Sequence, residues 1–246
     1  MKTAIIGDVH GCAVELQELL NLLNGIDRYI FVGDLVDKGP DSFGVLQLVR
    51  ELGDKAIVVE GNHETKNFKF WKKMEAGDEE AAMSVKTADD LLRVHNTTDQ
   101  ETKEWLKAKT VPYFRNGFTV VHGGILPSVV ELPSDPTELS GKNKKRVLRS
   151  MFIRYLDDKG AMVEFGKEEP HFKLWAETYD GRFGHVFFGH QPFLQEEPAK
   201  FDFATGLDLG CVHGGKLCAA IIEPHKTVYF ETVDAKEVYC DPLSLD

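Results

Sequence analysis

Long apolar runs are missing from this sequence, and none approaches the ~18 residues that a membrane-spanning helix needs. The first strand-like stretch already begins at Thr3, which leaves no room for a signal peptide. Internal repeats and low-complexity segments are absent as well. We therefore expect a cytoplasmic protein. At 246 residues, it should form one large domain or a domain with an insertion.

The sequence also has few positively charged residues relative to acidic ones, and no closely spaced pair of cysteines. Lys and Arg number 29 against 40 Asp and Glu, and the net charge of −11 argues against broad nucleic-acid binding, which depends on neutralising phosphates. A small anionic substrate remains compatible, because bound metal ions would invert the local charge. The four cysteines show no CxxC spacing, and we expect reduced core residues.

Three short apolar runs in the first quarter of the chain each lead into a polar side chain beside glycine. These side chains are Asp8, Asp34 and Asn62, about 27 residues apart, which is the length of one β-α-β step. The segments between them carry apolar residues at helical spacing. Residues 1 to about 62 therefore predict parallel strands, whose carboxyl ends bring the three side chains to one edge of a sheet.

The chain becomes polar and helical from about residue 64 to 110. Thr98 and Glu101 predict a capping box at the start of its last helix. We expect a single domain over residues 1–246 with this segment as a helical insert.

Strand-like character returns after the insert. An Asn-Gly pair predicts a hairpin over residues 112–121. Residues 127–183 predict loops and short helices over the site face, including a helix at 147–156. Further strands are expected near residues 186–188, 204–209, 217–222 and 228–230, with the last two paired across 223–226.

Four histidines also lie at the ends of apolar runs. His10, His122 and His190 adjoin a glycine, and His63 follows Asn62. Together with the carboxylates and the amide they form a set of oxygen and imidazole donors, which suits Mn, Fe or Zn. We predict that Asp34 bridges two ions, ~3.5–4 Å apart, that clamp a phosphate. The first ion would be held by Asp8, His10 and Asp34, and the second by Asp34, Asn62, His122 and His190.

His63 directly follows a predicted ligand and is left over from this set. We expect it to act as a general acid that protonates the leaving group. Asp37 would fix its tautomer, or would merely cap the loop before Gly39 and Pro40. Lys38 and an arginine from residues 127–183 would neutralise the phosphate.

Five blocks of the sequence carry a resemblance to a known family. The blocks are Gly7-Asp8-Val9-His10-Gly11, Gly33-Asp34-Leu35-Val36-Asp37-Lys38-Gly39, Gly61-Asn62-His63-Glu64, His122-Gly123-Gly124 and Gly189-His190. They occur in order between residues 7 and 190 and resemble the signature blocks of the phosphoprotein phosphatase (PPP) family of calcineurin-like metallophosphoesterases. The resemblance implies an α/β fold, a four-layer αββα sandwich, a dimetal centre and hydrolysis of phosphate esters or anhydrides by metal-bound hydroxide.

Within the family, Lys38-Gly39-Pro40-Asp41-Ser42 resembles the ApaH-like branch, which is related to symmetrical bis(5′-nucleosyl)-tetraphosphatases. Protein Ser/Thr phosphatases typically have Arg where this chain has Lys38. The tail over residues 207–217 is similar to the C-terminal strand pair of bacterial dinucleoside tetraphosphatases. Arg154 falls where family members place a phosphate-binding arginine. His213 sits near the expected mouth of the site, with either a substrate role or a surface role.

The leading hypothesis is hydrolysis of diadenosine tetraphosphate or a related nucleoside polyphosphate. A protein Ser/Thr phosphatase, with a phosphoprotein substrate, is the main alternative, followed by a broad phosphatase or polyphosphatase. A non-catalytic metal- or nucleotide-binding module would be expected to lose a ligand or the acid, and this chain has lost none. Two divalent ions are expected, with Mn first and Fe, Zn, Co or Ni also compatible with the donor set.

Overall fold

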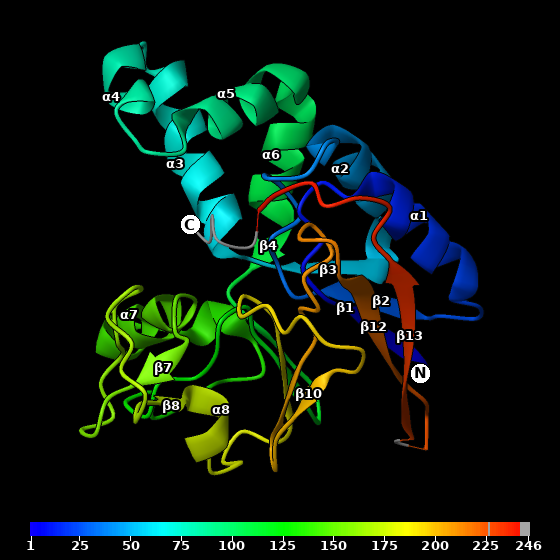
Figure 1. Ribbon diagram of the computed structural model, residues 1–246, viewed down its shortest axis with the longest axis vertical. Helices are drawn as coiled ribbons and strands as arrows, with labels where there is room; N and C mark the ends of the chain where they lie inside the picture. Colours follow the sequence, from blue (N-terminus) through cyan, green and yellow to red (C-terminus); the bar gives the residue numbers. More distant parts are fainter. Residues whose placement is uncertain (226, 242–246) are drawn as a thin grey trace.

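The computed structural model describes residues 1–225 and 227–241. Its strands form a six-stranded sheet in the order β13-β12-β1-β2-β3-β4 and a five-stranded sheet in the order β10-β11-β9-β6-β5 (Figure 1). The first sheet contains β1 (Thr3–Ile6), β2 (Arg28–Phe31), β3 (Ala56–Val59), β4 (Thr110–Val111), β12 (Lys216–Ile222) and β13 (Val228–Asp234). The second contains β5 (Phe114–Arg115), β6 (Thr119–Val120), β9 (Val186–Phe188), β10 (Ala199–Lys200) and β11 (Ala204–Gly206).

A separate short pair is formed by two further strands, β7 (Tyr155–Leu156) and β8 (Lys173–Leu174). The α-helices are α1 (Ala13–Leu22), α2 (Ser42–Glu51), α3 (Asn62–Glu75), α4 (Glu79–Met83), α5 (Ala88–Thr97), α6 (Gln100–Lys109), α7 (Gly141–Ser150) and α8 (Trp175–Thr178). Two 3₁₀ turns, η1 (Gly53–Lys55) and η2 (Pro136–Glu138), complete the described elements.

The N-terminal unit has the predicted β-α-β-α-β order. β1 pairs in parallel with β2, β2 with β3 and β3 with β4, while β12 runs antiparallel to β1. The Asp41 side chain accepts a hydrogen bond from the Gly44 amide and so caps α2. The parallel order places the carboxyl ends of β1, β2 and β3 at one edge of the sheet.

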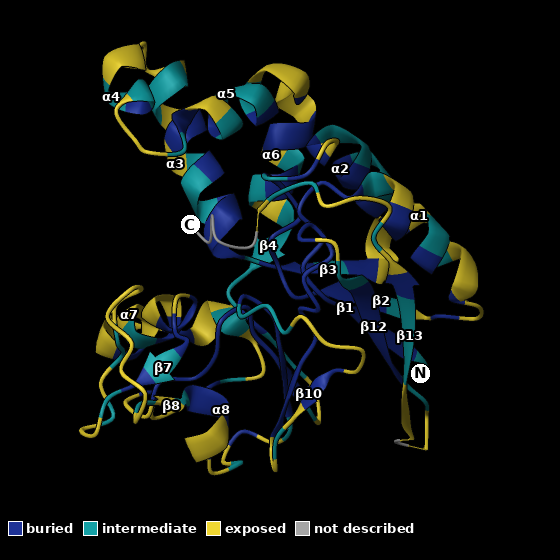
Figure 2. Cartoon of the chain, viewed as in Figure 1, coloured by how far each residue is buried: buried dark blue, intermediate teal, exposed yellow. Residues whose placement is uncertain are grey.

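Alternating side chains on the strands divide the interior into three cores. Ala4 and Ile6 of β1 belong to the core shared with α1 and α2, whereas Ile5 belongs to the core between the two sheets. On β9, Phe187 joins this inter-sheet core, and Phe188 joins a third core with residues of α7 and α8. Three cores separate four layers, which confirms the predicted αββα sandwich. Figure 2 shows the central strands buried and exposed residues gathered at α4 and α7.

The predicted helical character of residues 64–110 appears as α3 to α6, which project beyond the first sheet (Figure 1). Trp71 and Leu106 are fully buried and share the core of α1 and α2. The predicted capping box is wrong. Thr98 terminates α5 by donating its amide to Val94, and the Asp99 side chain caps α6 by accepting from the Thr102 amide at 2.7 Å.

The helix predicted at residues 147–156 exists only over residues 147–150, as the end of α7, so its predicted bounds are wrong. Helix α7 begins at Gly141 and ends at Ser150, whose hydroxyl donates to the Arg146 carbonyl at 2.9 Å. Beyond it, Ile153 is buried in the third core, and residues 155–156 pair with β8. The chain must be extended here for Ile153 to reach the core and for residues 155–156 to pair with β8. In this conformation the Arg154 side chain donates to the His190 carbonyl.

The C-terminal hairpin is confirmed, because β12 and β13 pair antiparallel from Lys216 opposite Asp234 to Ile222 opposite Val228. The predicted turn includes Lys226, which lies outside the described residues. Within the described residues, no helix has both the length and the apolar character needed to cross a membrane.

Candidate metal centre

Nine of the eleven predicted site residues follow five strand ends, drawn from both sheets. The two sheets meet here, because the ring nitrogen Nδ1 of His122, from the second sheet, lies 3.0 Å from the Val32 carbonyl of the first. By element, β1 is followed by Asp8 and His10, β2 by Asp34, Asp37 and Lys38, β3 by Asn62 and His63, β6 by His122, and β9 by His190.

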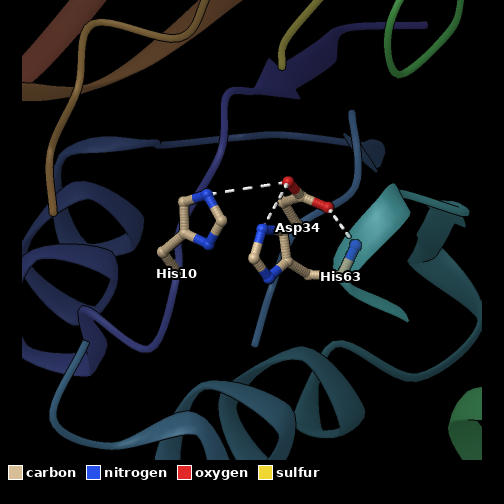
Figure 3. A group of neighbouring side chains, drawn as sticks. All are labelled: His10, Asp34 and His63. Carbon is tan, nitrogen blue, oxygen red and sulfur yellow. Dashed lines mark hydrogen bonds and ion pairs between the residues drawn. The ribbon is translucent and has the colours of Figure 1, made fainter. Parts of the chain in front are cut away.

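The Asp34 carboxylate is the common point of these residues. Its Oδ2 lies 3.6 Å from Nε2 of His10 and 4.0 Å from Nε2 of His63. Figure 3 marks both contacts with dashed lines. Nε2 of His122 lies 3.4 Å from the same oxygen. Asp34 is only 2% exposed, so these imidazoles rather than water surround its charge.

Two groups of potential metal ligands share Asp34. One is His10, Asp34 and His63, and the other is Asp34, His122 and His190. Asn62 adjoins the second group, because its Oδ1 lies 2.8 Å from Nε2 of His122. A carboxylate that bridges two ions must belong to both ligand groups, and Asp34 does.

The protonation of His10 and His190 suits metal binding, whereas His122 carries a proton. Burial holds the pKa of His10 and of His190 well below the usual value, so both are neutral imidazoles, the form that ligates metals. Burial also acts to lower the pKa of His122, but Asp34, Asp8 and Glu64 outweigh it and raise the value to about 9. A divalent cation beside Asp34 would supply the positive charge that this proton otherwise brings.

Asp8 joins the group through the backbone of the second sheet. Its Oδ2 accepts a hydrogen bond from the His190 amide at 2.9 Å. Its Oδ1 is buried and has no hydrogen-bond partner among the described residues. Burial and the nearby Asp208 raise the pKa of Asp8 well above the usual value. An orphaned, buried carboxylate oxygen is costly without a partner, and a metal ion would provide one.

His63 is held by two polar neighbours. Its ring nitrogen Nδ1 lies 2.8 Å from Oδ2 of Asp37, and Asn67 donates to both carboxylate oxygens of Asp37 at 3.0 Å. The His63 amide donates to Oδ1 of Asp34 at 2.9 Å. This arrangement leaves Nε2 of His63 facing Asp34. We missed Asn67 in the sequence, although its i+4 spacing from His63 places both on one helix face.

Glu64 is a second residue that we did not single out from the sequence. It is fully buried, and its carboxylate accepts hydrogen bonds from the amides of Asp34, Leu35 and Gly61, each at 2.8 Å. It therefore ties the loop after β2 to the start of α3. Its position three residues after Gly61 is that of a capping box, which was the available signal.

Replacing Glu64 with alanine is expected to lower the free energy of unfolding by about 3 kcal/mol or more. Three buried amides would lose their acceptor, and each unsatisfied group costs ~1–3 kcal/mol. Urea unfolding measures the change. Glu101→Ala is the matched control, because it removes only an exposed ion pair with Arg50 and should cost under ~1 kcal/mol. Equal costs for the two variants would contradict the role of Glu64.

The backbone is strained at the site. Five non-glycine residues in the described part of the chain have positive φ angles, between 47° and 71°. Such conformations are disfavoured for residues with a Cβ atom and concentrate at functional sites. Every one of the five is a predicted site residue: His10, Asp34, Asp37, Lys38 and His190.

Two glycines, Gly189 and Gly61, allow the Asp8 and Asp34 carboxylates to pack directly against the backbone. A Cβ atom at Gly189 would lie 1.8 Å from Oδ1 of Asp8, and one at Gly61 would lie 2.2 Å from Oδ1 of Asp34. Both distances are far below contact, so a side chain at either position would displace a predicted ligand.

The three predicted substrate residues reach the same place. Lys38, Arg154 and His213 line a cavity of about 10 Å³ with His10 and Asp34, room for a group the size of a water molecule or an ion. Arg154 donates from Nη2 to the His190 carbonyl at 3.3 Å. Nδ1 of His213 lies 2.9 Å from the Cys240 carbonyl. The structure thus brings all of the predicted site residues together.

Comparisons with known proteins agree with this geometry. A family model described as calcineurin-like phosphoesterase matches residues 1–203. The chain is 32% identical over 232 residues to an asymmetrical bis(5′-nucleosyl)-tetraphosphatase of Oceanobacillus iheyensis, covering 89% of this chain and 88% of that one. It is 32% identical over 255 residues to a symmetrical bis(5′-nucleosyl)-tetraphosphatase of Ralstonia nicotianae, covering 87% of each.

A solved structure described as a candidate diadenosine tetraphosphatase superposes with a TM-score of 0.68 at 26% identity, covering 95% of this chain and 93% of that one. The matched family implies a dimetal centre, and the buried groups around Asp34 fit one. The family match spans more than four fifths of the sequence. The chain therefore belongs to the calcineurin-like phosphoesterase family and is a metallophosphoesterase.

Proposed function

We propose that this protein hydrolyses a phosphoanhydride bond of diadenosine tetraphosphate or a related nucleoside polyphosphate. The single observation that carries the proposal is the sharing of Asp34 between two groups of buried ligands. The names of the two relatives supply the substrate class, because both are tetraphosphatases of bis-nucleosyl compounds.

In this proposal, Asp8, His10 and Asp34 hold one divalent ion, and Asp34, Asn62, His122 and His190 hold the other. We propose manganese for both, since the carboxylate and amide oxygens of the set suit it. When bound, the pair would neutralise phosphate oxygens and lower the pKa of a water molecule.

His63 supplies the proton to the leaving phosphate oxygen. Asp37 accepts from Nδ1, which fixes the tautomer and leaves Nε2 directed into the site. Asn67 holds Asp37 in turn and has a buried amide group, so the whole chain of contacts is shielded from solvent. A general acid held in this way is set before the substrate arrives.

Lys38, Arg154 and His213 contact the phosphates. Lys38 and Arg154 are cations that line the cavity with the predicted ligands, in a protein of net charge −11. A tetraphosphate carries more negative charge than a phosphoserine, so these cations favour the polyanion.

Replacing Lys38 with arginine is expected to lower the preference for dinucleoside tetraphosphate over a phosphopeptide by about tenfold, or ~1.4 kcal/mol. The guanidinium presents a fixed fork instead of a point charge and would contact the phosphate with different geometry. The ratio of the two kcat/KM values measures the effect. An unchanged ratio would show that Lys38 does not set the preference.

Product analysis tests the proposed function. The manganese-loaded protein is given diadenosine tetraphosphate and a phosphopeptide in separate reactions, and the products are resolved by chromatography. ADP as the sole nucleotide establishes symmetrical cleavage, which the sequence favours, whereas ATP with AMP establishes asymmetrical cleavage. Phosphate released only from the peptide would overturn the proposal and favour a protein phosphatase.

A further inference from the structure

A second cavity of about 320 Å³ opens beside the metal centre. Asn62, Arg154 and His190, all buried residues of the site, form part of its lining. Its size lies within the ~300–1,000 Å³ range of small-molecule sites. One part of a ligand could therefore bind in this cavity while its phosphate lies at the metal centre.

Two exposed aromatic rings line the same cavity. Phe152 is 42% exposed and Phe165 is 54% exposed, although neither ring is needed to close a core. The guanidinium of Arg154 lies over the Phe165 ring, 4.9 Å from its centroid. One face of the ring is thus occupied, and the residue as a whole is still more than half exposed, which leaves room for a ligand.

We propose that Phe165, in the cavity that Phe152 also lines, binds the nucleobase of the nucleotide whose phosphates lie at the metal centre. The inference rests on the proposed function and specifies its substrate class: a nucleotide recognised by its base, rather than a phosphate group alone. Every base has a π face, so stacking on an aromatic ring selects a nucleoside over inorganic polyphosphate without requiring a particular base.

The charges around the cavity agree with this orientation. Arg154 and Lys66 line it near Asn62 and His190, where the phosphates would lie. Glu164 and Glu168 line it as well, but both are exposed, and Glu164 is paired with Lys167. Arg154 contacts both the His190 carbonyl and the Phe165 ring, so the positions proposed for the phosphates and for the base adjoin at this residue.

Calorimetry with two probes tests the proposal. ADP and inorganic pyrophosphate are titrated into the manganese-loaded protein and into its Phe165→Ala variant. The variant should bind ADP about 10–100-fold more weakly, the effect of losing one base stacked on one ring. Pyrophosphate affinity should stay within about twofold, because the probe has no base. Phe165→Trp should retain ADP binding.

Phe203→Ala is the matched control. Phe203 is 45% exposed, and its carbonyl accepts from the amide of Val186 at the start of β9, the end opposite His190. This variant should bind both probes as the original protein does. An equal loss for both probes in Phe165→Ala would mean that Phe165 only positions Arg154, which would overturn the proposal. So would unchanged ADP binding, or no ADP binding by the original protein.

These binding constants are independent of turnover. A selective loss of ADP affinity, in a protein that leaves diadenosine tetraphosphate intact, would refute the proposed function and retain the base site. Hydrolysis of the dinucleotide, with no effect of Phe165→Ala on ADP binding, would support the proposed function and refute the base site.

Discussion

Replacement of His63 by asparagine should lower kcat by about 10²- to 10⁴-fold, the usual contribution of a positioned general acid, with both metal ions still bound. The reason lies in the contacts of the ring, whose Nδ1 is 2.8 Å from Asp37 and whose Nε2 faces the shared carboxylate of Asp34. Steady-state kinetics measures the loss, and elemental analysis counts the ions. An aryl phosphate with an acidic leaving group needs the proton less and should lose less activity.

The matched control is His171→Asn, since the His171 side chain is 53% exposed and lies outside the site. Its activity should not change. Two results would contradict the assignment of His63. Undiminished turnover would show that His63 is not the acid. Loss of one ion would show that it is a ligand, which its grouping with His10 and Asp34 makes a real alternative.

Replacement of Asp34 by asparagine should remove both metal ions and lower activity by about 10³-fold or more, since metal ions contribute several kcal/mol of transition-state stabilisation. A neutral amide cannot bridge two cations as a carboxylate does. The asparagine carbonyl can still accept from the His63 amide, which Asp34 accepts at 2.9 Å, so the fold should persist and circular dichroism should show it.

Asp99→Asn makes the same chemical change at the cap of α6, where asparagine caps equally well, and should retain two ions per chain. If Asp34→Asn also retained two ions, the bridging role would be wrong.

Much of the fold could be predicted, and so could the set of residues that lie together around Asp34, because the relevant signals are local. A strand, a glycine and a polar residue are adjacent in sequence at Asp8 and Asp34, and the parallel order of β1 and β2 then places both carboxylates at one edge. Helix ends in the insert were harder to predict. Thr98 and Asp99 are both good capping residues, and only the end of α5 decides between them.

Other features depend on contacts between distant residues and leave no local signal. Glu64 accepts from amides 29 and 30 residues away, so its role follows from the packing of α3 against the loop after β2. The positive φ angles of His10 and Lys38 are imposed by the surrounding loops and not by residue type. The exposure of Phe165 and its contact with Arg154 could not be predicted either, because the surrounding segment has no hydrophobic periodicity.

An anomalous-scattering map of manganese-loaded crystals tests the central claim most directly. Two peaks are expected, ~3.5–4 Å apart, one on each side of the Asp34 carboxylate. Asp8 and His10 should contact the first, and Asn62, His122 and His190 the second. A single peak, or a pair that Asp34 does not bridge, would contradict the proposed centre.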